Sequence, residues 1–166
     1  MTSYDRKTLE ELFEGRLPAD QLNAMRSAHK DPARFEQMME IHAARLRWPE
    51  RLLLPLGESL YIVETTSGER VVYCECRHDF GDYRVNWKLS ALIFVRDTDA
   101  LMQEVYSASS SADPDWMELR EFYCPGCLRQ LEVEAVPPGY PVVFDFEPDL
   151  ETFYDEWLGT PLADSG

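Results

Sequence analysis

Arg120-Glu-Phe-Tyr-Cys-Pro-Gly-Cys127 ends in two cysteines separated by a turn-forming dipeptide, and this arrangement is the strongest structural signal in the sequence. Pro125 restricts its own φ, and Gly126 can take the positive φ that would strain other residues. Two thiolates reach one metal ion only if the chain turns sharply between them. β-rich sequence flanks both sides, whereas the CxxC motif of redox proteins usually opens a helix. We therefore predict a hairpin that binds a metal.

A second and closer pair of cysteines stands about fifty residues earlier, in Cys74-Glu-Cys-Arg-His78. A structural zinc ion takes four ligands in a tetrahedron, so this half must supply two ligands to complement the first half. It offers three candidates, and His78 could replace either cysteine. The preferred set is the one with four thiolates: Cys74, Cys76, Cys124 and Cys127.

Four protein ligands leave a zinc ion no open position for water or substrate, so this metal site is expected to be structural. The rest of the sequence offers no glycine-rich phosphate loop, no HExxH motif and no sequence context of a catalytic triad. We accordingly predict no catalytic residues and no cofactor-binding residues in this chain.

The composition limits the classes of partner. The 166 residues carry a formal charge of −15, from 31 acidic and 16 basic side chains, and this charge disfavours nucleic-acid binding. No apolar run approaches the ~20 residues of a membrane-spanning helix. The first residues lack the apolar segment of a signal peptide, so we expect a cytoplasmic protein. The reducing cytosol then favours a metal over disulfides as the partner of the cysteines.

Residues 1 to about 48 have helical character. The expected helices are short: one with a capping box at Thr8-Leu-Glu-Glu11 that ends near Gly15, one from Pro18, and one from Asp31-Pro32 to Trp48-Pro49. Helices of this length are marginal in isolation and must pack on something. A helical arm that packs on a partner protein is one hypothesis for this region.

The remainder of the chain is mostly β-rich. Strands are expected at 59–65, 70–74, 89–95, 117–123, 130–136 and 141–146, and helices at 97–106 and 150–158. The predicted fold is α+β, a zinc-ribbon-like β core of two hairpins with an N-terminal helical extension and a short C-terminal helix. The expected domains are residues 1–55 for the extension, 56–150 for the zinc-binding β-rich domain, and 151–166 for the helix and tail.

Four segments of the sequence resemble the small (gamma) subunit family of acetone carboxylase and related ATP-dependent ketone carboxylases, including acetophenone carboxylase. The resemblance covers roughly residues 60 to 150. Phe80-Gly-Asp-Tyr-Arg84 with Asn86-Trp-Lys88 is more specific than the CPGC element, which many zinc proteins contain. The segments are Cys74-Glu-Cys-Arg-His-Asp-Phe-Gly-Asp-Tyr-Arg-Val-Asn-Trp-Lys88, Ala91-Leu-Ile-Phe-Val-Arg-Asp-Thr98, Arg120-Glu-Phe-Tyr-Cys-Pro-Gly-Cys127 and Val133-Glu-Ala-Val-Pro-Pro-Gly-Tyr-Pro-Val-Val-Phe-Asp-Phe-Glu-Pro-Asp149.

The resemblance implies a non-catalytic zinc-binding subunit with a structural or assembly role. Its partners would be large alpha and beta carboxylase subunits related to hydantoinases, in a hetero-hexamer with two copies of each chain. Those subunits would bind ATP, and manganese, and convert a ketone and bicarbonate into a β-keto acid. One position departs from expectation, because Arg77 stands where a metal-binding turn would favour glycine.

Two other classes of function stay open at this point. One is a free-standing zinc-ribbon module for protein interaction or regulation, which predicts a stable monomer. The other is a zinc hydrolase or lyase, which requires an open coordination site.

Overall fold

The computed structural model describes residues 4–29, 31 and 33–163, and the chain divides into two compact units, 1–52 and 53–166. The first unit is helical and has a small core of its own, in which Leu9, Met25 and Ile41 are buried. Its helices are α1 (Arg6–Phe13), α2 (Ala19–Ser27) and α3 (Arg34–Leu46). The predicted helical character of this region is thus confirmed.

The caps of these helices differ in detail from the predicted ones. Asp5 caps α1, because its carboxylate accepts a hydrogen bond of 2.7 Å from the Thr8 N–H, so the helix begins before the predicted capping box. Gly15 follows α1 and has a φ of +67°, the left-handed conformation in which a glycine commonly ends a helix, as predicted. Asp31 accepts a hydrogen bond of 3.0 Å from the Ala33 N–H ahead of α3. Pro32 lies outside the described residues.

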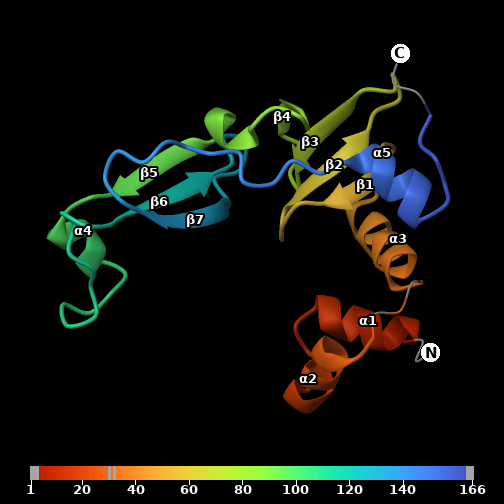
Figure 1. The fold of residues 1–166 in the computed structure, drawn as a ribbon, viewed down its shortest axis with the longest axis horizontal. Coiled ribbons are helices and arrows are strands. Elements are labelled where there is room, and N and C mark those ends of the chain that lie inside the picture. Colours follow the sequence, from red (N-terminus) through yellow and green to blue (C-terminus); the bar gives the residue numbers. More distant parts are fainter. Residues whose placement is uncertain (1–3, 30, 32, 164–166) are drawn as a thin grey trace. The chain divides into compact units, whose positions relative to one another are not determined.

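The second unit contains two antiparallel sheets, which Figure 1 shows in yellow to green and in green to blue. The first has the order β1-β2-β3-β4 and the second the order β5-β6-β7. The strands are β1 (Arg51–Pro55), β2 (Leu60–Glu64), β3 (Arg70–Cys74), β4 (Asp79–Asp82), β5 (Leu92–Arg96), β6 (Glu118–Tyr123) and β7 (Gln130–Val136).

This architecture confirms the predicted α+β fold with a zinc-ribbon-like β core. The hairpins β2–β3 and β6–β7 lie where the sequence places them. Two strands were not expected. Strand β1 falls inside the range 1–55 assigned to the helical extension, and β4 pairs with β3 across the first cysteine pair. The short helix α4 (Asp99–Gln103) lies within the predicted range 97–106.

The core of the second unit joins its two sheets. Four aromatic rings form an edge-to-face series from His78 through Phe80 and Trp87 to Phe122, with ring centroids 5.0, 5.8 and 6.1 Å apart. Phe80 belongs to β4 and Phe122 to β6, and Trp87 opens the 3₁₀ helix Trp87–Ser90 between the sheets. The series therefore connects the first cysteine turn to the second sheet.

The strand expected at 141–146 is absent, and the prediction was wrong. This segment lies along the second sheet, where side chains from that sheet and from the 3₁₀ turn bond it (Figure 1). Asn86 donates to the Val142 carbonyl at 3.4 Å, and Arg120 donates to the Pro141 carbonyl at 3.4 Å and to the preceding Tyr140 carbonyl at 2.9 Å. Because side chains bond these carbonyls, the segment follows the sheet without joining its ladder.

The predicted C-terminal helix is present but begins as α5 (Leu150–Thr152) and continues as a π-helical turn, Phe153–Trp157. The Leu158 N–H donates to the Phe153 carbonyl at 3.1 Å, which is the spacing of a π-helix. The Tyr154 hydroxyl donates to the Leu53 carbonyl of β1 at 2.7 Å, so the turn is attached to the first sheet. None of the helices in the described ranges combines the length and apolar character that a membrane crossing needs.

Candidate metal centre

Each pair of cysteines lies in a turn that connects two antiparallel strands. Cys74 is the last residue of β3, and Cys76 follows it in the turn toward β4. Cys124 comes directly after β6, and Cys127 precedes β7. One cysteine of each pair is buried and the other exposed, so the four sulfurs meet at the edge of the core.

The four sulfur atoms form one compact group, all within 4.8 Å of one another. The Cys76 and Cys124 sulfurs are 3.6 Å apart, and the Cys74 and Cys127 sulfurs 3.8 Å. These distances exclude a disulfide, whose S–S length is about 2.05 Å. A regular tetrahedron with Zn–S bonds of roughly 2.3 Å has edges of about 3.8 Å. The four side chains therefore have the chemistry and the spacing of a tetrahedral zinc site.

The two turns share one pattern of backbone hydrogen bonds. In the first, the Cys74 N–H donates to the His78 carbonyl at 3.0 Å, and the Arg77 N–H donates to the Cys74 carbonyl at 2.7 Å. In the second, the Cys124 N–H donates to the Arg129 carbonyl at 2.9 Å, and the Leu128 N–H donates to the Cys124 carbonyl at 2.8 Å. The two turns are thus similar in structure, and each contributes two cysteines to one group of four sulfurs.

The residue after the second cysteine of each turn has a backbone conformation in the left-handed region. Arg77 has a φ of 70° and Leu128 a φ of 59°, a region that costs non-glycine residues roughly 1–2 kcal/mol. The expected glycine is thus replaced by arginine without loss of the turn conformation. Both residues keep this conformation because the hydrogen bonds on either side of them close the turn.

Gly126 is required for the close approach of the two cysteine turns, and not for a positive φ as predicted. It is not among the residues with positive φ. A Cβ atom at this position would instead lie 3.0 Å from the His78 Cβ and 3.3 Å from the Cys76 sulfur. Glycine therefore allows the second turn to approach the first closely enough for the sulfurs to meet.

The surroundings act differently on the individual thiols. Burial raises the pKa of Cys74 and of Cys124 above the ordinary value, because a buried thiolate loses its hydration. A hydrogen bond from the backbone N–H of Arg129 lowers the pKa of Cys127. The Gly126 N–H also donates to the Cys124 sulfur, at 3.3 Å. A bound cation would supply the positive charge that the buried thiolates lack.

His78 occupies a different position from the sulfurs. In the described part of the chain, the close group of candidate ligands consists of the four cysteines and does not include this histidine. Its ring packs edge-on against Phe80 at 5.0 Å, and its Cβ lies against Gly126. These contacts favour a packing role for His78 and a site of four thiolates.

Arg129 links the two turns, and no motif in the sequence points to it. Its guanidinium donates to the Ser59 hydroxyl at 2.8 Å and forms an ion pair with Glu75, which lies between the first two cysteines. The Glu75 N–H in turn donates to the Ser59 carbonyl at 2.9 Å. The contact joins residues 70 positions apart, so only the folded chain reveals it.

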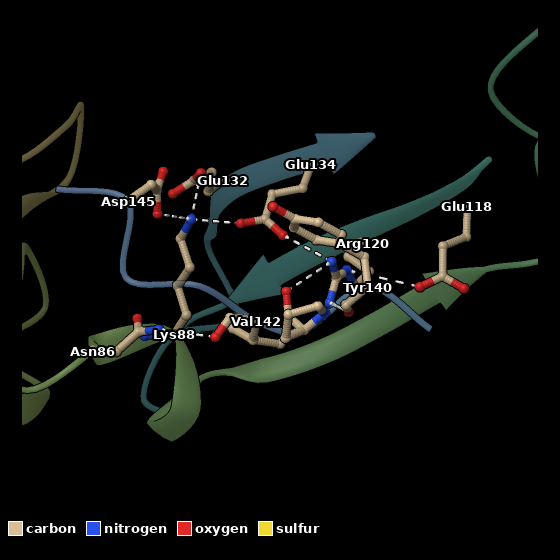
Figure 2. Close-up of polar contacts among 10 residues, drawn as sticks. Asn86, Lys88, Glu118, Arg120, Glu132, Glu134, Tyr140, Val142 and Asp145 are labelled. Carbon is tan, nitrogen blue, oxygen red and sulfur yellow. Dashed lines mark hydrogen bonds and ion pairs between the residues drawn. The ribbon is translucent and has the colours of Figure 1, made fainter. Parts of the chain in front are cut away.

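A second polar cluster lies on the sheet β5-β6-β7, around Lys88 (Figure 2). The Lys88 ammonium is within 2.8 Å of Glu132, 2.5 Å of Glu134 and 2.7 Å of Asp145. Burial alone would lower the pKa of Lys88, but hydrogen bonds to these carboxylates raise it above the ordinary value. The positively charged ammonium of Lys88 therefore balances the negative charge of the three carboxylates.

Known proteins provide independent information on the chain. The sequence model of the family described as "Acetone carboxylase gamma subunit" matches residues 46–158. The acetone carboxylase gamma subunit of Xanthobacter autotrophicus (strain ATCC BAA-1158 / Py2) is 44% identical over 163 residues, which cover 98% of this chain and 97% of that protein. The acetophenone carboxylase beta subunit of Aromatoleum aromaticum (strain DSM 19018 / LMG 30748 / EbN1) is 32% identical over 111 residues, covering 65% of this chain and 78% of that protein.

Proposed function

Because the chain belongs to the acetone carboxylase gamma subunit family, we propose that it is the small, non-catalytic subunit of an ATP-dependent ketone carboxylase. The observation that carries this proposal is the 44% identity to a named gamma subunit, which extends over nearly the full length of both chains. The relation to an acetophenone carboxylase subunit supports the wider class of ketone carboxylases.

In this proposal the chain binds one structural zinc ion through Cys74, Cys76, Cys124 and Cys127. The mutual distances of the four sulfurs and the matched turns around them support this ligand set. Zinc binding by cysteine turns contributes on the order of 10–16 kcal/mol in finger peptides. A contribution of that size would hold together two hairpins that lie far apart in the sequence.

The partners would be large alpha and beta subunits related to hydantoinases, with two copies of each chain in a hetero-hexamer. The large subunits would bind ATP and manganese and would convert a ketone and bicarbonate into a β-keto acid. The small subunit would contribute assembly, and the complex would work in the cytoplasm. The four-sulfur site supports a structural role, since four protein ligands leave zinc no position for substrate.

The assembly is tested by co-expression with the alpha and beta carboxylase subunits of the same organism. We expect the three chains to co-purify in equal amounts and the complex to carboxylate a ketone in the presence of ATP. The large subunits alone should give no stable complex of this size, and the isolated small subunit should be inactive. A small subunit that remains a monomer beside both large subunits would contradict the proposal and favour a free-standing zinc-ribbon module.

The metal site is tested separately on the purified chain. We expect one equivalent of zinc per chain, and Co²⁺ in its place should give the charge-transfer absorption of thiolate ligands. The Cys76→Ser variant should lose most of the bound metal, whereas His78→Ala, the matched control, should retain it. Retention by Cys76→Ser together with loss in His78→Ala would instead establish a ligand set of three cysteines and one histidine.

A further inference from the structure

Strand β5 is an apolar edge of the second sheet, and its outer side has no partner strand within the described residues. The sheet order is β5-β6-β7, and among the described strands β5 pairs with β6 alone. Its sequence is Leu92-Ile-Phe-Val-Arg96, in which Ile93 and Phe94 are each 41% exposed. An uncovered apolar edge strand offers unpaired backbone groups to another chain, and stable soluble proteins usually protect such edges.

We propose that β5 is the docking edge for an extended segment of a large carboxylase subunit, which adds to the sheet as a fourth strand beside β5. This inference rests on the proposed function and goes beyond it by assigning the interface to one edge. The unpaired N–H and C=O groups require an occupant in the extended conformation, because a helix uses its own backbone groups internally.

Successive side chains of β5 point to opposite faces of the sheet, and both faces are apolar at this edge. Leu92 and Phe94 share one face, and Ile93 points to the other. The incoming segment should therefore carry apolar side chains at successive positions, one set against each face. Its main chain would supply the hydrogen bonds, and these side chains would supply the specificity.

Charge favours a basic partner over a second copy of this chain. Asp97 and Asp99 are exposed directly after β5. The positive charge of Arg96 does not offset these aspartates, because its guanidinium already forms ion pairs with Glu121 at 2.8 Å and with Glu104 at 2.7 Å. Two copies would each bring a formal charge of −15, whereas Lys or Arg beside the incoming strand would complement the acidic flank.

The sheet supplies a matched pair of positions for the test. Phe94 of β5 faces Glu121 of β6, and Glu121 faces Val133 of β7, so these residues form one row across the sheet. Phe94 and Val133 lie on the same face and are similarly exposed, at 41% and 48%, but they stand at opposite edges. A lysine at either position adds the same charge to the same face, and only the one in β5 lies at the proposed docking edge.

The experiment compares Phe94→Lys with Val133→Lys in co-expression with the alpha and beta carboxylase subunits. We expect Phe94→Lys to weaken association at least tenfold, and Val133→Lys to bind within about twofold of the wild type. Zinc content and the thermal midpoint of each free variant establish that it has folded. If both variants bind like the wild type, or if Val133→Lys is the weaker one, the docking edge is wrong.

Residue-resolved hydrogen exchange on the unsubstituted chain provides a test that does not depend on any variant. In the free chain, alternate amides of β5 should exchange quickly because they point away from β6, and they should become at least tenfold slower in the complex. A complex that forms without slowing these amides overturns the inference and leaves the proposed function intact. Failure of the complex to form overturns both, so the two failures are distinguishable.

Discussion

At the scale of single residues, Lys88 shows how one buried ammonium group can bring several carboxylates together. The residue is 1% exposed, yet its ammonium contacts three carboxylates from β7 and from the segment that follows (Figure 2). Those carboxylates would otherwise repel one another across a short distance. The lysine thus holds residues 141–146 against the second sheet through its ion pair with Asp145.

The first prediction concerns removal of this ammonium. Lys88→Met keeps the length of the side chain but leaves the carboxylates uncompensated, and should lower the free energy of unfolding by about 2–4 kcal/mol. Urea denaturation at pH 7 measures this change. Lys7→Met is the control, because Lys7 is exposed and its ion pair with Glu11 spans 3.8 Å, so its effect should be below about 0.5 kcal/mol. Equal effects of the two substitutions would contradict the role of Lys88.

The same variant should respond differently to pH. Burial tends to raise the pKa of Asp145, but its hydrogen bond and charge interaction with Lys88 hold that pKa below the ordinary value. A carboxyl group with a lowered pKa stabilises the fold above about pH 4, and this contribution disappears as the pH falls through its folded pKa. The gap in stability between wild type and Lys88→Met should therefore narrow between pH 5 and about pH 3. A constant gap over this range would refute the explanation.

The second prediction concerns the close approach at Gly126. Gly126→Ala places a Cβ 3.0 Å from the Cβ of His78 and should push the two cysteine turns apart. We expect zinc affinity to fall by roughly 10- to 100-fold, which corresponds to about 1–3 kcal/mol of overpacking. Competition with a chromophoric chelator measures the affinity. Gly57→Ala is the control, since no atom of the residues placed by the structure lies within 4 Å of its added Cβ, and unchanged affinity in both variants would reject the argument.

At the scale of elements, the two sheets are tied together by irregular segments. The segment between β7 and α5 is bonded by side chains of the second sheet, and the π-helical turn after α5 is bonded to β1 of the first. Arg70 of β3 adds a further tie, because it bonds Glu151 at 2.5 Å and the Ala163 carbonyl at 2.6 Å. The C-terminal residues therefore serve as a strap within the second unit.

The third prediction tests the attachment of this strap. Tyr154→Phe removes the donor to the buried Leu53 carbonyl and should lower the free energy of unfolding by about 1–2 kcal/mol. The substitution should also speed up amide hydrogen exchange in residues 150–163 more than in β6. Tyr140→Phe is the control, because Tyr140 is exposed, and should change the stability by less than about 0.5 kcal/mol. A strap that stays protected in Tyr154→Phe would show that the hydroxyl is dispensable.

At the scale of the whole molecule, the two compact units have very unequal cores. Among the residues that the structure describes, three buried apolar side chains form the core of the first unit, whereas a dozen buried residues, Cys74 and Cys124 among them, form the continuous cluster of the second. A helical unit of about fifty residues with so small a core is marginal in isolation. This inequality agrees with the hypothesis that the helical arm packs on a partner.

The fourth prediction follows from that inequality. Limited proteolysis of the free, zinc-loaded chain should cut within residues 1–52 first and leave a resistant fragment that contains all four cysteines. Mass spectrometry of the fragments over time identifies the order of cleavage. In complex with the large subunits, the first unit should be cut at least tenfold more slowly. Equal resistance of both units in the free chain would refute the marginal stability of the arm.

Elements with local signals can be predicted from the order of residues along the chain. Turn residues between two β-rich runs predict the hairpin β2–β3, and the spacing of Cys124 and Cys127 predicts a metal-binding turn before any partner is known. Gly15 likewise marks the end of α1. These features depend on a few neighbouring residues and on their preferred backbone angles, so they can be recognised without the fold.

Features that depend on contacts between distant residues become visible only in the folded chain. The segment 141–146 has the composition of a strand, but Asn86, Lys88 and Arg120 bond it from other parts of the chain and keep it out of the ladder. The meeting of the two cysteine pairs depends on a space beside His78 that only glycine leaves open. Local preference is weak compared with such contacts, because burial and charge pairing act on residues that the sequence separates by tens of positions.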